Sequence, residues 1–167
     1  MLERINQKMG SLLHFFGLIA GYLTFGITLL VVVNIISRFF FNAPMGGTLE
    51  VTEAALPIII FLSLALTQHK GEHIKVTLVM RRFSPKYICW GNVVTSLLGC
   101  LFFAWATYAA WDLFIKSFMM NEKAWGSIIL PLYPVKFIIF IGLLMLSIQF
   151  FIDALLFIQK SNQRALS

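Results

Sequence analysis

The stretch that decides the fold runs from Leu49 to Gln68 and reads LEVTEAALPIIIFLSLALTQ. After Glu53 it contains only apolar residues and two hydroxyl side chains until it reaches Gln68. An α-helix of about 20 predominantly apolar residues crosses the hydrocarbon core of a bilayer. This stretch has that length, and we therefore predict a transmembrane helix over residues 49–68.

Three further apolar runs of comparable length, at residues 11–37, 88–115 and 128–157, accompany this one. Of the 167 residues 59% are hydrophobic and only 12% are charged, whereas a soluble domain carries about 25% charged residues. This composition disfavours a soluble enzyme, a disordered chain and a nucleic-acid-binding protein. The first run exceeds the apolar core of a signal peptide, about 7 to 15 residues. We predict a single all-α integral membrane domain over residues 1–167 with four transmembrane helices.

The basic residues indicate how these helices are oriented, because cytoplasmic loops retain Lys and Arg. With both termini inside, four basic residues face outward: Arg38, Lys116, Lys123 and Lys136. The inner segments hold nine: Arg4, Lys8, Lys70, Lys75, Arg81, Arg82, Lys86, Lys160 and Arg164. We therefore predict that both termini and the loop between the second and third helices are cytoplasmic.

The loop segment at residues 72–83 is too charged to span the membrane but contains regularly placed apolar residues. Its periodicity does not decide between strand and helix. We expect a short interfacial segment, and we favour a helix lying on the surface because an unpaired strand edge is costly near hydrocarbon.

Glu50 and Glu53 are the most informative charged residues. The 16 helical steps from Glu53 to His69 span roughly 24 Å, which is less than the hydrocarbon thickness of about 30 Å, so Glu53 should lie at or below the outer boundary. One interpretation is structural: the carboxylates complement the helix dipole, Thr48 is the N-cap, and Arg38 neutralises one carboxylate. The alternatives are a contact with another subunit, or coordination of a proton or sodium ion.

The remaining charges cluster at the same depth. Asp112 and Lys116 have the i,i+4 spacing of an ion pair, and Lys136 near the start of the fourth helix can extend toward the headgroups. The centre of the membrane is almost free of charge, which is unlike a pore. In the first helix, Gly17 and Gly21 form a small-residue pair that would allow another helix to approach closely.

His69 and His73 are also four residues apart, but no nearby third ligand completes a zinc site. The sequence contains no phosphate-binding loop, nucleophile elbow or zinc-protease motif. We therefore expect no metal, no cofactor and no enzymatic activity in this chain.

Taken together, four features of the sequence resemble the small membrane subunit of tripartite ATP-independent periplasmic (TRAP) transporters. They are Arg38-Phe39-Phe40-Phe41-Asn42-Ala43-Pro44, the pair Glu50 and Glu53, the run Gly71-Glu72-His73-Ile74-Lys75-Val76, and Pro131-Leu132-Tyr133-Pro134. The spacing from Glu53 to the Gly-Glu-His-Ile run is the most specific feature. One departure is that such chains often carry a Trp just before the first Glu, where this chain has Gly46-Gly47-Thr48-Leu49.

The resemblance implies a subunit of a secondary transporter in the bacterial inner membrane. A periplasmic binding protein would deliver an organic acid, and a large membrane subunit would transport it with sodium bound in that subunit. The small subunit would scaffold the large one and offer outer-face contacts. The sequence looks most similar to sialic-acid systems, while a dicarboxylate or another sugar acid stays open.

Two other membrane functions fit the sequence less well. A small proton-coupled exporter working as a homodimer needs a carboxylate deep in its first helix, and Ser11 to Ser37 contains none. A haem-binding anchor needs histidines at opposite depths, whereas His14 and His69 are both expected near the inner side. The exporter stays as the main alternative to the transporter subunit.

Overall fold

The computed structural model describes residues 2–70, 85–124 and 126–165. Within these ranges the chain forms four long helices: α1 (Leu2–Phe41), α2 (Thr48–Lys70), α4 (Pro85–Met119) and α5 (Tyr133–Ala165). Each contains a segment that is long and apolar enough to cross a membrane. The predicted all-α fold with four transmembrane helices is therefore confirmed. The expected interfacial segment at residues 72–83 lies outside the described residues.

A short hairpin connects α4 to α5. Strand β1 (Lys123–Ala124) pairs antiparallel with β2 (Leu130–Pro131), and Ala124 lies opposite Leu130. The backbone N–H of Leu132 donates to the carbonyl of Glu122 at 3.0 Å and closes the base of the hairpin. Because this pairing uses residues 130–131, α5 begins at Tyr133, and not at residue 128 where the apolar run begins.

The loop at residues 42–47 connects α1 to α2 and folds back on the end of α1. Its backbone is held by Asn34, whose Oδ1 accepts the N–H of Met45 at 2.9 Å. Gly47 has a φ of 88°, a conformation that glycine adopts without steric cost, and its carbonyl accepts the N–H of Val51 at 3.0 Å. The N-cap of α2 is therefore Gly47, and not Thr48 as expected. The hydroxyl of Thr48 donates to the carbonyl of Met45 instead.

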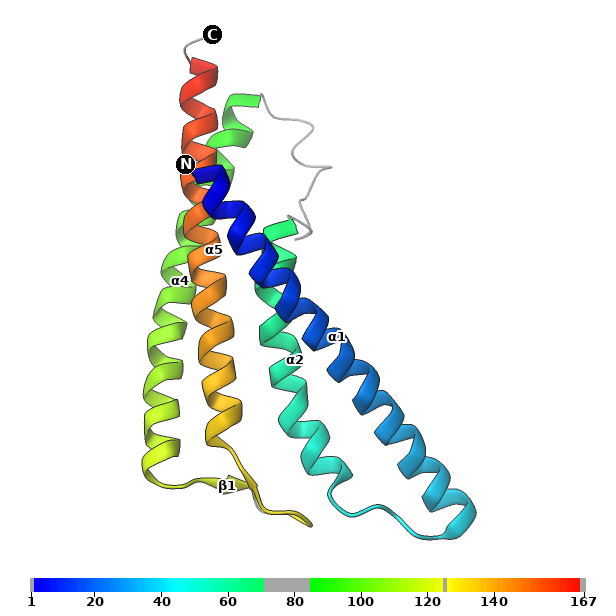
Figure 1. The fold of residues 1–167 in the computed structure, drawn as a ribbon. Coiled ribbons are helices and arrows are strands. Elements are labelled where there is room, and N and C mark those ends of the chain that lie inside the picture. Colours follow the sequence, from blue (N-terminus) through cyan, green and yellow to red (C-terminus); the bar gives the residue numbers. More distant parts are fainter. Residues whose placement is uncertain (1, 71–84, 125, 166–167) are drawn as a thin grey trace.

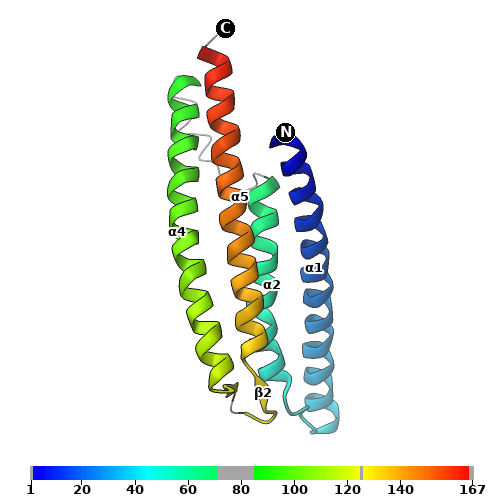
Figure 2. The same cartoon turned by 60° about the vertical axis from the view of Figure 1, so that its left-hand side comes forward.

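The four helices form a single row in the order α4, α5, α2, α1, and not a closed bundle (Figures 1 and 2). Helix α5 packs against both α4 and α2, whereas α1 packs mainly against α2. The β1–β2 hairpin and the loop at residues 42–47 lie at the same end of the four helices, which we call the hairpin end (Figure 1). Both chain termini lie toward the opposite end of the helices, which we call the terminal end (Figure 1).

Glycines show where α1 leaves α2. A Cβ atom added at Gly10 would lie 2.4 Å from Nε2 of His69, and one added at Gly17 would lie 2.3 Å from Cδ2 of Leu66. Gly21 and Gly26, further along α1, have no such neighbour within 4 Å. The two helices are therefore in close contact toward the terminal end and diverge toward the hairpin end (Figure 1).

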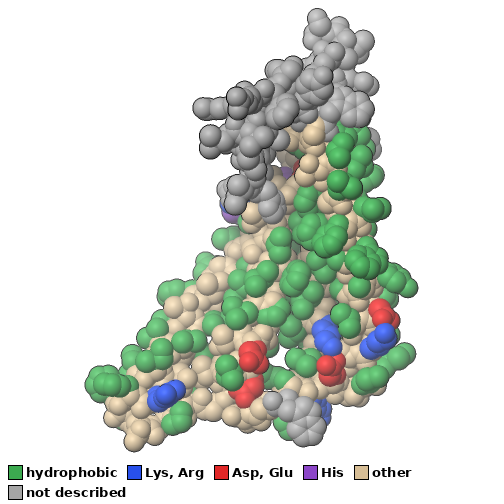
Figure 3. All heavy atoms as spheres, turned by 180° about the vertical axis from the view of Figure 1, so that it is seen from behind, with side chains coloured by type: hydrophobic (Ala, Val, Ile, Leu, Met, Phe, Trp, Pro, Cys, Tyr) green, Lys and Arg blue, Asp and Glu red, His purple; other side chains and the backbone are tan. Residues whose placement is uncertain are grey.

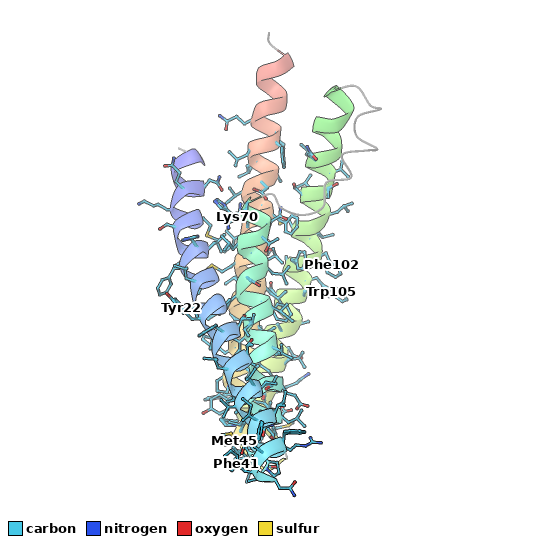
Figure 4. The ribbon with its side chains drawn as sticks, turned by 90° about the vertical axis from the view of Figure 1, so that its right-hand side faces the viewer. Tyr22, Phe41, Met45, Lys70, Phe102 and Trp105 are labelled. Atoms are coloured by element: carbon cyan, nitrogen blue, oxygen red, sulfur yellow. The ribbon has the colours of Figure 1, made fainter. Side chains whose placement is uncertain are left out.

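The core lies where α1, α2 and α5 meet. It consists of Leu13, Ala65 and Leu146, which are at most 1% exposed. Outside this cluster most large apolar side chains are exposed, as a bilayer requires. Figure 4 shows Tyr22 on α1 pointing away from the row at one edge, and Phe102 and Trp105 on α4 pointing away at the other.

Candidate interaction site at the hairpin end

Charged side chains gather at the hairpin end of the molecule. On the face seen in Figure 3, Lys, Arg, Asp and Glu side chains lie near that end, and the middle of the face is apolar. The sequence-predicted residues at this end are Arg38, Glu50, Glu53, Asp112 and Lys136. The structure gives these residues quite different surroundings.

Glu50 connects the first turn of α2 to the β1–β2 loop. Its Oε1 atom accepts a hydrogen bond from the backbone N–H of Ser127. Gly126 lies so close that an added Cβ atom would be 2.1 Å from the same Oε1 atom. A side chain at this position would therefore displace the Glu50 carboxylate from its present place. The Glu50 carboxylate therefore fastens the hairpin loop to α2.

Glu122 and Lys136 form an ion pair between the start of the hairpin and the first turns of α5. The Lys136 hydrogen bond, together with a smaller contribution from Ser117, lowers the pKa of the Glu122 carboxyl below its ordinary value. The Lys136 side chain is 26% exposed and that of Glu122 is 42% exposed. Lys136 thus does more than extend toward the headgroups, because it also holds the hairpin against α5.

Asp112 and Lys116 form the expected i,i+4 pair within α4, at 2.6 Å. Both side chains are more than half exposed. Exposed pairs of this kind contribute little to stability. The pair neutralises itself on the surface and does not connect α4 to another helix.

Glu53 and Arg38 differ from these three sites. Both side chains are exposed, and among the described residues neither forms an ion pair or a side-chain hydrogen bond. Arg38 therefore does not neutralise Glu50 or Glu53 within the described part of the chain. Two carboxylates three residues apart in sequence have separated roles, because Glu50 is used inside the chain and Glu53 faces outward.

A polar cluster at the terminal end was not identified as a site from the sequence. Gln149 is 0% exposed, and its Nε2 group donates to Asp153 Oδ1 at 3.0 Å and to Asn6 Oδ1 at 3.4 Å. Gln68 donates to the other oxygen of Asp153 at 2.7 Å. The cluster joins α1, α2 and α5 where they are in close contact. The sequence signal for it is the i,i+4 spacing of Gln149 and Asp153 in an otherwise apolar helix.

Of the two histidines spaced like zinc ligands, His73 lies outside the described residues. His69 lies against Gly10, and its Nδ1 atom is buried without a hydrogen-bond partner in the structure. Among the described residues, no group of three His, Cys, Asp or Glu side chains could hold a metal ion.

A family model described as "Tripartite ATP-independent periplasmic transporters, DctQ component" matches residues 27–160. The match extends from the second half of α1 to the last turns of α5 and includes the hairpin end. No curated protein and no solved structure matches the chain.

Proposed function

The chain belongs to the DctQ family, the small membrane subunits of TRAP transporters, and we propose that it scaffolds the large membrane subunit of a sodium-coupled importer. The imported compound would be an organic acid that a periplasmic binding protein delivers. Transport and sodium binding would take place in the large subunit.

The observation that carries this proposal is the single row of helices with apolar surfaces. A groove of 440 Å³ between α1 and α2 is lined by apolar residues and Tyr22. Charged side chains of the described residues lie near the two ends of the helices and not at mid-span. An ionised substrate needs charged or strongly polar partners along its path through hydrocarbon, and at mid-span the described residues offer hydroxyl groups but no charged side chain. A row of apolar helices can instead bury much of its surface against another membrane protein.

The hairpin end would face the periplasm, in line with the distribution of basic residues predicted from the sequence. The β1–β2 hairpin is held in place by Glu50 and by the Glu122–Lys136 pair. Such a fixed polar edge suits a soluble protein that docks from the periplasm. Lys123 in the hairpin is exposed and available for that contact.

The substrate class rests on family resemblance alone. A sialic acid is the compound that the sequence resemblance favours, and a four-carbon dicarboxylate or another sugar acid is the alternative. Because the substrate would bind the large subunit and the binding protein, we expect that exchanging the small subunit between systems leaves substrate preference unchanged.

Reconstitution tests the scaffold role. Vesicles holding this chain alone should take up no radiolabelled organic acid under a sodium gradient, whereas vesicles with the large subunit, this chain and the binding protein should. Uptake by the chain alone would overturn the proposal and favour the exporter. Full uptake by the large subunit without this chain would show that the scaffold is dispensable.

A further inference from the structure

Helix α2 exposes one narrow face toward the hairpin end, although it lies inside the row between α5 and α1. Leu49, Glu53, Leu56 and Ile60 follow one another at intervals of four, three and four residues, which places them on one side of a helix. We call these four residues the α2 stripe. Leu49 is 68% exposed, Leu56 48% and Ile60 50%.

Glu53 presents two kinds of unpaired acceptor within the α2 stripe. Its carboxylate has no donor among the described residues. Its backbone carbonyl also lacks the usual donor, because the residue four positions later is Pro57, which has no N–H. Unpaired acceptors are costly in hydrocarbon. Glu53 is thus an acceptor site to which no described residue donates, in a span that would lie in the membrane.

The other carboxylates at the hairpin end do not share this feature. Glu50 accepts the Ser127 N–H, Asp112 pairs with Lys116, and Glu122 pairs with Lys136. In the described part of the chain, Glu53 is the carboxylate at this end that lacks an internal donor. A basic side chain on a partner protein would supply the donor that the described residues do not.

We propose that the α2 stripe docks a transmembrane helix of the large membrane subunit, and that a Lys or Arg of that helix pairs with Glu53. This inference rests on the proposed function and adds where the two subunits meet. An ammonium group has three donors and a guanidinium has five, so either can satisfy the exposed carboxylate. The apolar members of the stripe would pack against the same helix.

The geometry disfavours three other occupants. Leu56 and Ile60 lie roughly 4.5 and 10 Å deeper along the helix than Glu53, where a soluble binding protein cannot reach. A second copy docked symmetrically through this stripe would place two Glu53 carboxylates against each other. A lipid ammonium group stays with the headgroups and would leave the deeper part of the stripe without a specific partner.

Site-specific photocrosslinking in cells that make all three proteins tests where the subunits meet. A photoreactive residue at Leu56 should form a crosslink to the large subunit, identified by mass spectrometry. The same residue at Trp105, which points outward on α4 (Figure 4), is the matched control and should give much less. Crosslinks from Leu56 only to a second copy, the binding protein or lipid would overturn the inference.

The same experiment separates this inference from the proposed function. If the wild-type chain does not purify with the large subunit at all, the proposed function fails and this inference fails with it. If the two subunits purify together but Leu56 does not crosslink, only the location of the interface is wrong.

Charge substitutions test the basic partner. Glu53→Gln should reduce recovery of the large subunit with the tagged chain by roughly tenfold or more, since breaking a buried charge pair is costly. Glu53→Lys should reduce it further because it places like charges together. Asp112→Asn, which neutralises a self-paired carboxylate, should leave recovery unchanged. Circular dichroism confirms that each variant is helical. Equal recovery with Glu53→Lys and wild type would overturn the charge pairing.

Discussion

The Nε2 group of Gln68 on α2 lies 2.7 Å from Oδ2 of Asp153 on α5 and donates a hydrogen bond to it. This contact joins two helices that are adjacent in the row but separated by 85 positions in the chain. Together with the buried Gln149 it fixes the terminal end of α2 against α5. The hairpin end, by contrast, is held by contacts of Glu50 and Glu122, close to the water interface.

The Gln68–Asp153 contact should contribute to stability. Gln68→Leu removes a donor from a partly buried carboxylate, and we expect a loss of about 0.5–2 kcal/mol, the range for hydrogen bonds between membrane helices. Unfolding of the purified chain in mixed micelles of increasing SDS content measures this. Ser63→Ala is the control, because the Ser63 hydroxyl bonds only to a carbonyl of its own helix. Equal losses for both variants would show that the interhelical bond contributes nothing.

Glu122 predicts a pH dependence at the hairpin. Its folded pKa is lowered below the ordinary value of 4.5, first by the Lys136 hydrogen bond. The ionised form thus stabilises the folded hairpin above about pH 4.5, and this contribution is lost as the pH falls through the folded pKa. Glu122→Gln should therefore lower the melting temperature slightly at pH 7.

Below the folded pKa of Glu122 the two proteins should melt alike, and high salt should reduce their difference because the pair is partly exposed. Thermal melts of wild type and Glu122→Gln over a series of pH values from 7 downward, at low and high salt, provide the comparison. A difference that stays constant as the pH falls well below 4.5 would contradict the assignment.

The orientation in the membrane can be tested by labelling residues expected on its two sides. In a background without Cys89 and Cys100, Lys123→Cys places a thiol in the exposed hairpin, and Lys75→Cys places one in the chain segment between α2 and α4. A membrane-impermeant maleimide should label Lys123→Cys in intact spheroplasts, and Lys75→Cys only after permeabilisation. The opposite labelling pattern would reverse the predicted topology.

The sequence predicts the helices better than their arrangement. Runs of about 20 apolar residues identify transmembrane helices because only a helix satisfies its backbone in hydrocarbon. The same apolar surfaces carry little information on neighbours, since a side chain facing lipid and one facing another helix can both be leucine. The row order α4, α5, α2, α1 was therefore not predictable from periodicity.

For the polar residues too, position along a helix is predictable from the sequence, whereas the contact partners are not. The depth of Glu50 and Glu53 follows from counting residues, but their separate roles depend on where the hairpin returns to α2. Ser127 is 77 positions from Glu50, and nothing local indicates that its N–H would reach that carboxylate. Gln149 does not interrupt the apolar run of its helix, because a single amide leaves the run long enough to span the membrane.

Gly17 and Gly21 provide a matched pair, because the structure brings only Gly17 against another helix of this chain. Gly17→Leu should push α1 away from Leu66 and destabilise the isolated chain by about 1–3 kcal/mol, the usual cost of overpacking. Gly21→Leu has open space in the same direction and should leave the stability of the isolated chain unchanged or slightly raised, since glycine is a poor helix former. SDS-induced unfolding of both variants measures the difference.

If Gly21→Leu is as harmful as Gly17→Leu in the isolated chain, α1 does not diverge from α2 beyond Gly17. If it is harmless there but lowers recovery of the large subunit, the open side of α1 is a second surface that the partner covers.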